Sequence, residues 1–183
     1  MKILHTLLIL AIQLSSVTVL LGQKSRTYDL AGLYHNKQLA VYNREADLLN
    51  GEDKKGIRLS EHAGEGVALI KGVTFSQGTI DIDLRGKDVF QQSFLGIAFH
   101  ALNDSVYDAI YFRPFNFHAK DSIRRIHAVQ YISHPLHTWK KLRDEQNGQY
   151  EKAVTPAPDP NDWFHARIEV TNEAVVVYVN HAK

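Results

Sequence analysis

Apolar and polar residues alternate along most of the chain after residue 38, most clearly between Gly78 and Ile132. Successive side chains of a strand point to opposite faces of a sheet, so this alternation predicts half-buried β-strands. The expected strands are Leu39–Tyr42, Ile57–Ser60, Gly66–Ile70, Val73–Phe75, Thr79–Leu84, Phe94–His100, Val106–Arg113, Ile126–Ile132, Phe164–Thr171 and Ala174–Asn180. Helical periodicity is not convincing after the first 22 residues. Short strands separated by turn residues predict an all-β sandwich or barrel.

The same alternation assigns the two faces of the expected sheet. The core-facing positions are Leu95, Ile97, Phe99, Ile110, Phe112, Val129 and Tyr131. The opposite face then carries Gly96, Ala98, His100, Ala109, Tyr111, Arg113, Ala128, Gln130 and Ile132. Because small residues stand beside large polar ones on this second face, we expect a groove there.

The polar side chains on and near this face are of the kind that binds sugars. Tyr111 offers an aromatic ring to the C–H groups of a pyranose, while Arg113 and Gln130 offer planar hydrogen-bonding groups to neighbouring hydroxyls. His100 and Asn116 complete the candidate ligand-binding set. An ordinary solvated sheet face carries the same residue types, so that interpretation stays open. The expected partner is carbohydrate.

A pair of acids is the first candidate for catalysis. Asp81 and Asp83 are two residues apart on one expected strand, so they share a face with Cα atoms about 6.5 to 7 Å apart. Paired carboxylates near that spacing can act as acid and base at a glycosidic bond. Arg85 and Lys87 occupy the next positions on that side, which favours a solvated outer face. With Asp108 as a third candidate, the catalytic residues remain unassigned.

The sequence gives little support for metal or thiol chemistry. His134 and His137 are close together in SHPLHTW, but a loop with two solvated imidazoles is the preferred interpretation. A structural calcium ion has no support either, so we expect no metal and no cofactor. The chain has no cysteine, which excludes disulfides and a cysteine nucleophile. A G-x-S-x-G nucleophile turn is absent as well.

The chain divides into three parts. Residues 1–22 have a basic Lys2, an apolar run from Ile3 to Leu21 and a small Gly22, which predicts a cleaved signal peptide and a secreted or periplasmic protein. An uncleaved membrane anchor is the alternative. Residues 23–37 are expected to be an irregular leader, and residues 38–183 one domain. No later segment is long and apolar enough to span a bilayer, so no membrane contact is expected after cleavage.

Charge and spacing add three expectations. The net charge is +1 and the basic residues are scattered, so nucleic-acid binding is not expected. Residues 140–162 form a long polar insertion with three prolines, and connections of that length are often functional or mobile. The last strand would leave an uncovered apolar edge, so we expect closing strands to be missing at the C-terminus. The oligomeric state cannot be read from these patterns.

Four segments, GTIDIDLRG, SFLGIAFHA, HAVQY and WFHARIEVTNEAVVVYVN, resemble the concanavalin A-like lectin/glucanase superfamily. The likeness is to its laminin G-like and 3-keto-disaccharide hydrolase-like branches and covers roughly residues 38–183. It implies a jelly roll of two antiparallel sheets whose concave face carries the carbohydrate site. The family's closing strands would follow Lys183.

The chain departs from the family pattern at two strands. Where members have G-I-F-L-R-G, His100 stands in place of the arginine, and where they have E-V-Q-I, Gln130 is kept but the acid is replaced by Ala128. Both departures count against hydrolysis. The resemblance therefore implies a secreted carbohydrate-binding jelly-roll domain, with a glycoside hydrolase or related sugar-processing enzyme as the alternative and a laminin G-like adhesion module as a second alternative.

Overall fold

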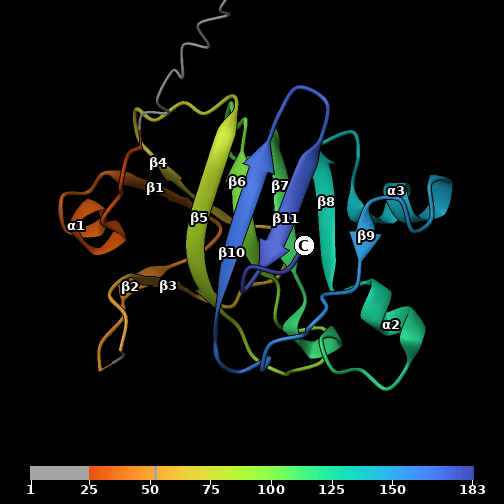
Figure 1. The fold of residues 1–183 in the computed structure, drawn as a ribbon. Helices are drawn as coiled ribbons and strands as arrows, with labels where there is room; N and C mark the ends of the chain where they lie inside the picture. Colours follow the sequence, from red (N-terminus) through yellow and green to blue (C-terminus); the bar gives the residue numbers. More distant parts are fainter. Residues whose placement is uncertain (1–24, 52) are drawn as a thin grey trace, which may run out of the picture.

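The computed structural model describes residues 25–51 and 53–183. These residues form eleven strands in four antiparallel sheets, together with three short α-helices and one 3-10 helix, as Figure 1 shows. The expectation of an all-β fold is confirmed at this level. The predicted signal peptide, residues 1–22, lies outside the described residues. Within the described ranges, no helix is long and apolar enough to cross a membrane.

Two larger sheets form the body of the molecule and lie one in front of the other (Figure 1). The front sheet has the order β11 (Val175–Val179), β10 (Trp163–Val170), β5 (Gly78–Arg85). The back sheet has the order β6 (Leu95–Phe99), β7 (Tyr107–Phe112), β8 (Val129–His134), β9 (Glu151–Lys152). Their facing side chains make the main core, where the rings of Phe112 and Phe164 meet with centroids 5.1 Å apart.

The strand register agrees with the face assignment made from the sequence. Leu95 pairs with Phe112, whereas Gly96 pairs with Tyr111, and Tyr111 pairs with Gln130. Directly paired residues share a face, so Tyr111 and Gln130 lie on the side away from the core. The strands approach closely at Gly96, where an added Cβ would lie 2.0 Å from the carbonyl oxygen of Ile110. Only glycine fits there without moving the backbone.

Part of the face away from the core, where alternation predicted a groove, is covered by a helix. Helix α3 (Trp139–Glu145) packs on it, with Leu142 buried against Tyr107, Ala109 and Ile132. Ala128, expected on this face, is instead part of the main core. The cover comes from the segment that follows β8, and its burial of apolar area stabilises the helix, which is too short to be stable alone.

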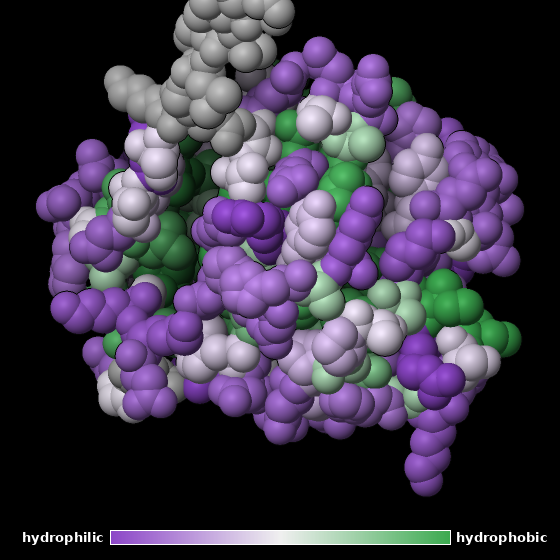
Figure 2. Space-filling view, in the orientation of Figure 1, coloured by the Kyte–Doolittle hydropathy of each residue, from purple (hydrophilic) through white to green (hydrophobic). Residues whose placement is uncertain are grey.

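Two small sheets lie on the flank beside β5, at the left in Figure 1. One pairs β1 (Leu39–Tyr42) with β4 (Val67–Ile70), and the other pairs β2 (Ala46–Leu48) with β3 (Ile57–Leu59). Strands β5 and β6 each stand at the end of their sheet's order. Figure 2 shows apolar residues in a hollow between this flank and the body of the molecule.

Several short elements differ from the sequence-based expectation. Val73–Phe75 is not a strand, and the expected leader contains α1 (Leu30–His35). The expected strand from Ile126 begins only at Val129, because α2 (Ser122–Ile126) occupies the preceding residues after the 3-10 helix η1 (Pro114–Asn116). Helix α2 starts where the Asp121 side chain accepts a hydrogen bond from the Ile123 N–H. The capping residue fixes a helix that is too short to show periodicity.

Candidate functional site

The back sheet holds a buried polar cluster under α3. Tyr111 lies opposite Gln130, and Gln130 lies opposite Glu151, so β7, β8 and β9 place three polar side chains in one row. Arg113 follows β7 directly, and Arg143 reaches the row from α3. We call these five residues the Glu151 cluster. Alternation placed Tyr111, Arg113 and Gln130 on one face, and in the structure these three side chains are hydrogen-bonded to one another.

Arg113 is the centre of the Glu151 cluster. Its Nη2 donates to the Tyr111 hydroxyl and to Gln130 Oε1, each at 2.5 Å. Its Nη1 donates to the His127 carbonyl at 2.9 Å and to Glu151 Oε1 at 3.2 Å. Burial lowers the pKa of Arg113, while Tyr111 and Glu151 oppose the shift. The guanidinium is thus held in one orientation by four acceptors.

Glu151 is 2% exposed and faces three basic side chains. Arg143 donates two hydrogen bonds to its carboxylate: Nε lies 3.0 Å from Oε2, and Nη2 donates to Oε1. His127 Nδ1 lies 2.8 Å from Oε2 but not at a hydrogen-bonding angle, so the two groups are in close contact without a hydrogen bond. Burial acts to raise the pKa of Glu151, but Arg143, His127 and Arg113 outweigh it and the pKa is lowered. A bidentate pair of this kind is strong and fixed in direction.

Tyr111 and Gln130 complete the cluster's hydrogen bonds. The Tyr111 hydroxyl donates to Gln130 Oε1 at 2.8 Å, and Gln130 Nε2 donates to the Trp139 carbonyl at 3.3 Å. Burial raises the pKa of Tyr111 to about 12, so the hydroxyl stays protonated at neutral pH. Gln130 is buried and acts beneath the surface, joining the sheet to the start of α3.

Exposed aromatic rings surround the Glu151 cluster, and each is backed by an arginine. Phe90, Phe94 and Trp139 are 56%, 54% and 43% exposed. The guanidinium carbons of their arginines lie close to the ring centroids: Arg124 to Phe90 at 4.4 Å, Arg113 to Phe94 at 5.9 Å and Arg143 to Trp139 at 5.0 Å. We call these six residues the arginine–aromatic rim. Exposed apolar residues that gather in one patch mark ligand-binding grooves or interaction sites more often than scattered ones do.

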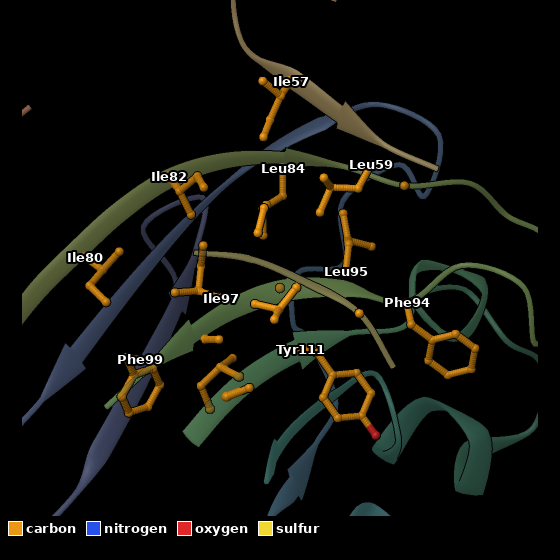
Figure 3. A pocket seen from close by; sticks show the side chains of 18 of the residues that line it. Ile57, Leu59, Ile80, Ile82, Leu84, Phe94, Leu95, Ile97, Phe99 and Tyr111 are labelled. Atoms are coloured by element: carbon orange, nitrogen blue, oxygen red, sulfur yellow. The ribbon is translucent and has the colours of Figure 1, made fainter. Parts of the chain in front are cut away.

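All six rim residues line one large hollow of about 3690 Å³. Figure 3 shows its apolar part, where Ile57 and Leu59 of β3 face Ile82 and Leu84 of β5. The opposite wall is β6 with Leu95 and Ile97, and Phe94 and Tyr111 stand at one end (Figure 3). The hollow therefore runs from an apolar region at the edge of β6 to the rim.

Four of the five predicted ligand-binding residues line the hollow, but they do not form one group. Tyr111, Arg113 and Asn116 line it near the rim, and His100 lines it elsewhere, while Gln130 lies below its surface. Asn116 is tied to the rim, because its side chain donates to the His127 carbonyl and accepts from Arg124.

His100 is turned away from the face on which alternation placed it. Its φ of +51° ends β6, and its ring then contacts Asp108 Oδ2 at 2.7 Å and the Ser76 carbonyl at 2.6 Å. Asp108 pairs with Phe99, on the core-facing side of the sheet. The carbonyl of Ser76, and then Asp108, raise the pKa of His100. The backbone reversal separates His100 from Arg113, a change that the alternation gave no sign of.

The candidate acids are held in ion pairs. Asp81 accepts from Arg167 Nε at 2.9 Å and Asp83 from Lys54 Nζ at 2.6 Å, and these hydrogen bonds lower the pKa of each. The His165 ring lies between them, 3.1 Å from Asp81 and 3.0 Å from Asp83. A general acid in glycoside hydrolysis needs a raised pKa. The arrangement therefore favours ion pairing on the outer face of β5.

Sequence reasoning missed Glu151, Arg143 and every other residue of the arginine–aromatic rim except Arg113. Both charged residues lie in or beside the 140–162 insertion, whose length was the only signal of a functional role. In the described part of the chain, no group of three or more His, Asp or Glu side chains is arranged to hold a metal ion. The site thus offers aromatic surface, guanidinium groups and amide groups as its chemistry.

Comparisons with family models, with curated proteins and with solved structures give no match for this chain. A function for the chain is therefore inferred from the residues of this site.

Proposed function

We propose that this chain is a secreted, carbohydrate-binding domain of the jelly-roll type, and that its ligand lies on the arginine–aromatic rim. The observation that carries the proposal is the set of exposed rings on Phe90, Phe94 and Trp139, each fixed beside a guanidinium. Sugar rings bind by laying C–H groups on an aromatic face while fixed polar groups meet their hydroxyls. The rim supplies both kinds of group within one hollow.

The buried network below the rim supports the proposal because it fixes the polar groups before any ligand arrives. Arg113 and Glu151 are buried, and their hydrogen bonds hold Arg113, Tyr111 and Arg143, which line the hollow, in fixed positions. A preorganised site loses less conformational entropy on binding than a flexible one. The volume of the hollow exceeds that of a typical small-molecule pocket, so an oligosaccharide fits better than a monosaccharide.

The two-sheet fold and the predicted signal peptide also support the proposal. Two antiparallel sheets packed face to face are the basic arrangement of a jelly roll, and the resemblance of residues 38–183 leads to the same class. The apolar N-terminal segment favours export. Binding is preferred over hydrolysis because Asp81 and Asp83 are engaged in ion pairs and Asp108 in a contact with His100.

The test is binding of the purified protein to an array of plant, bacterial and animal glycans. We expect at least one class of glycan to bind, and we expect Trp139→Ala to weaken that binding about tenfold, as loss of a stacking ring should. Phe94→Ala is the second variant. Both rings are largely exposed, so their removal leaves the core intact.

Tyr42→Ala is the matched control. Tyr42 is 40% exposed on β1 and is not part of the hollow, so its removal deletes a similar ring outside the site. Its affinity should equal that of the wild type. Failure of every glycan to bind, or equal losses in Trp139→Ala and Tyr42→Ala, would rule out a carbohydrate site at the rim.

A further inference from the structure

The arginine–aromatic rim carries more positive than negative charge. Of its three arginines, Arg113 and Arg143 share a single buried carboxylate, that of Glu151. Arg124 makes its hydrogen bonds to neutral oxygens, the Asn116 side chain at 3.3 Å and the Phe115 carbonyl at 3.1 Å. These four charged groups therefore leave an excess of two positive charges at the edge of the hollow.

Neighbouring acids do not remove this excess. Asp144, the acid one residue from Arg143, forms an ion pair with Lys140 and is more than half exposed. Glu65 is also exposed and contacts His134. Solvent-exposed charges are screened within about 10 Å at moderate salt, whereas groups inside a hollow are screened less. The rim thus keeps a positive potential in its hollow.

Two of the arginines keep donors for a ligand. Arg143 uses Nε and Nη2 on Glu151, and Arg124 uses Nε and Nη2 on Asn116 and Phe115. Among the described residues, no hydrogen bond is made by Nη1 of either arginine. Each Nη1 carries two N–H groups, and an oxyanion is the acceptor that a guanidinium binds most strongly.

The stacked pairs set the position of that oxyanion relative to the sugar ring. Arg143 lies over Trp139 and Arg124 lies over Phe90, so each cation stands next to an apolar surface. The guanidinium occupies one face of each ring, so a pyranose lies on the other face and a substituent that extends past the ring edge reaches the cation. A neutral sugar would leave the charge excess uncompensated, whereas an anionic sugar would neutralise it.

We propose that the ligand of this site is an acidic glycan, whose pyranose rings carry carboxylate or sulfate groups that bind Arg124 and Arg143. The inference rests on the proposed function and narrows its ligand class. Recognition pairs each anionic group with a guanidinium and each sugar face with an aromatic ring.

The experiment compares acidic and neutral oligosaccharides of equal length by titration calorimetry on the full chain. The probes are an oligogalacturonate, a sulfated dextran oligosaccharide and an unmodified dextran oligosaccharide. We expect the acidic probes to bind at least tenfold more tightly than the neutral one, and the affinity to fall as sodium chloride is raised. The carboxylated and sulfated probes distinguish the two kinds of anionic group.

Arg124→Gln tests the site, and Arg125→Gln is its matched control. Arg125 is the next residue of α2, but it is exposed, its Nη1 bonds to the Ala119 and Lys120 carbonyls, and it does not line the hollow. Both variants remove one positive charge from the same helix. We expect Arg124→Gln to weaken binding of the acidic probe about tenfold and Arg125→Gln to change it less than twofold.

Three other outcomes would overturn the inference. Equal losses in the two variants would mean that net charge alone attracts the acidic probe. Tight binding of neutral glycans, unaffected by Arg124→Gln, would leave the carbohydrate site standing and reject the acidic ligand. Binding of no glycan on the array would reject the carbohydrate site, and the acidic ligand with it.

Discussion

The outer faces of the two large sheets carry the same chemistry at different depths. On the back sheet, Glu151 meets Arg113 with N···O at 3.2 Å and is 2% exposed. On the front sheet, Asp81 meets Arg167 with N···O at 2.9 Å and is 42% exposed. Both acids also face a histidine. The distances are alike, so burial, and not contact geometry, determines what each cluster contributes.

Burial makes the Glu151 cluster a structural frame for the rim. Glu151 joins β9 to α3 through Arg143, and Arg143 stacks on Trp139. In a buried site each unmatched charge is poorly solvated, so the groups are confined to the one arrangement that satisfies them all. On β5, water also solvates the carboxylates, so each ion pair there contributes less to stability.

Removal of the buried carboxylate should change the free energy of unfolding more than any other substitution in the two clusters. Glu151→Ala leaves the guanidinium of Arg113 buried without its counter-charge, and we expect a loss of about 3 to 5 kcal/mol in the free energy of unfolding. Urea denaturation at pH 7 measures it. A loss below about 1 kcal/mol would show that the cluster behaves like a surface ion pair.

Acid should reveal the same difference by titration. The pKa of Glu151 is below its ordinary value of 4.5 in the folded protein, so the unfolded chain takes up the proton first. Its stabilisation is complete above the unfolded pKa and is lost as the pH falls through the folded pKa. We expect the free energy of unfolding to decline below about pH 5, and Glu151→Gln to decline less steeply, in urea titrations across that range.

The acids of the front sheet provide the comparison for this titration. Asp81 and Asp83 also have lowered pKa values, so their contributions have the same sign. Their exposure weakens those contributions by solvent screening. If Asp81→Asn and Glu151→Gln reduced the acid-dependent loss of unfolding free energy equally, burial would not determine the size of the contribution.

The smallest effect is expected on the front sheet at neutral pH. Asp81→Asn removes an exposed partner of Arg167 and His165, which water can replace. We expect the melting temperature to change by about 2 °C or less, and the change to disappear in about 0.5 M sodium chloride. Calorimetry at the two salt concentrations measures this. A large shift that salt does not remove would place these ion pairs in the same class as Glu151.

Most of the strands could be predicted because alternation depends on burial of one face. Leu39–Tyr42 has the expected bounds, and Tyr107–Phe112 and Trp163–Val170 are within one residue of theirs at either end. The helices could not. Helices α2 and α3 depend on the caps Asp121 and Thr138 and on tertiary packing, which leave no periodic pattern in the sequence.

The site was predictable only where it lies on regular strands. Parity placed Tyr111 with Arg113 and Gln130, because these positions follow a fixed two-residue period. The rule fails for His100 because its positive φ reverses the backbone. It could not be applied to Glu151, which lies on a two-residue strand after an irregular insertion. Long-range pairing, such as that of Glu151 with Arg113, depends on how the chain returns to the sheet and has no local signature.

The fluorescence of Trp139 can report binding at the rim. The chain has two tryptophans, and the other, Trp163, stacks with Arg85 and Lys54 at the start of β10. Replacement of Trp163 by phenylalanine would leave one indole, partly exposed to water and in contact with Arg143. A ligand that covers it shifts its fluorescence emission to shorter wavelength. Occupancy of the site is then visible in solution without any added dye.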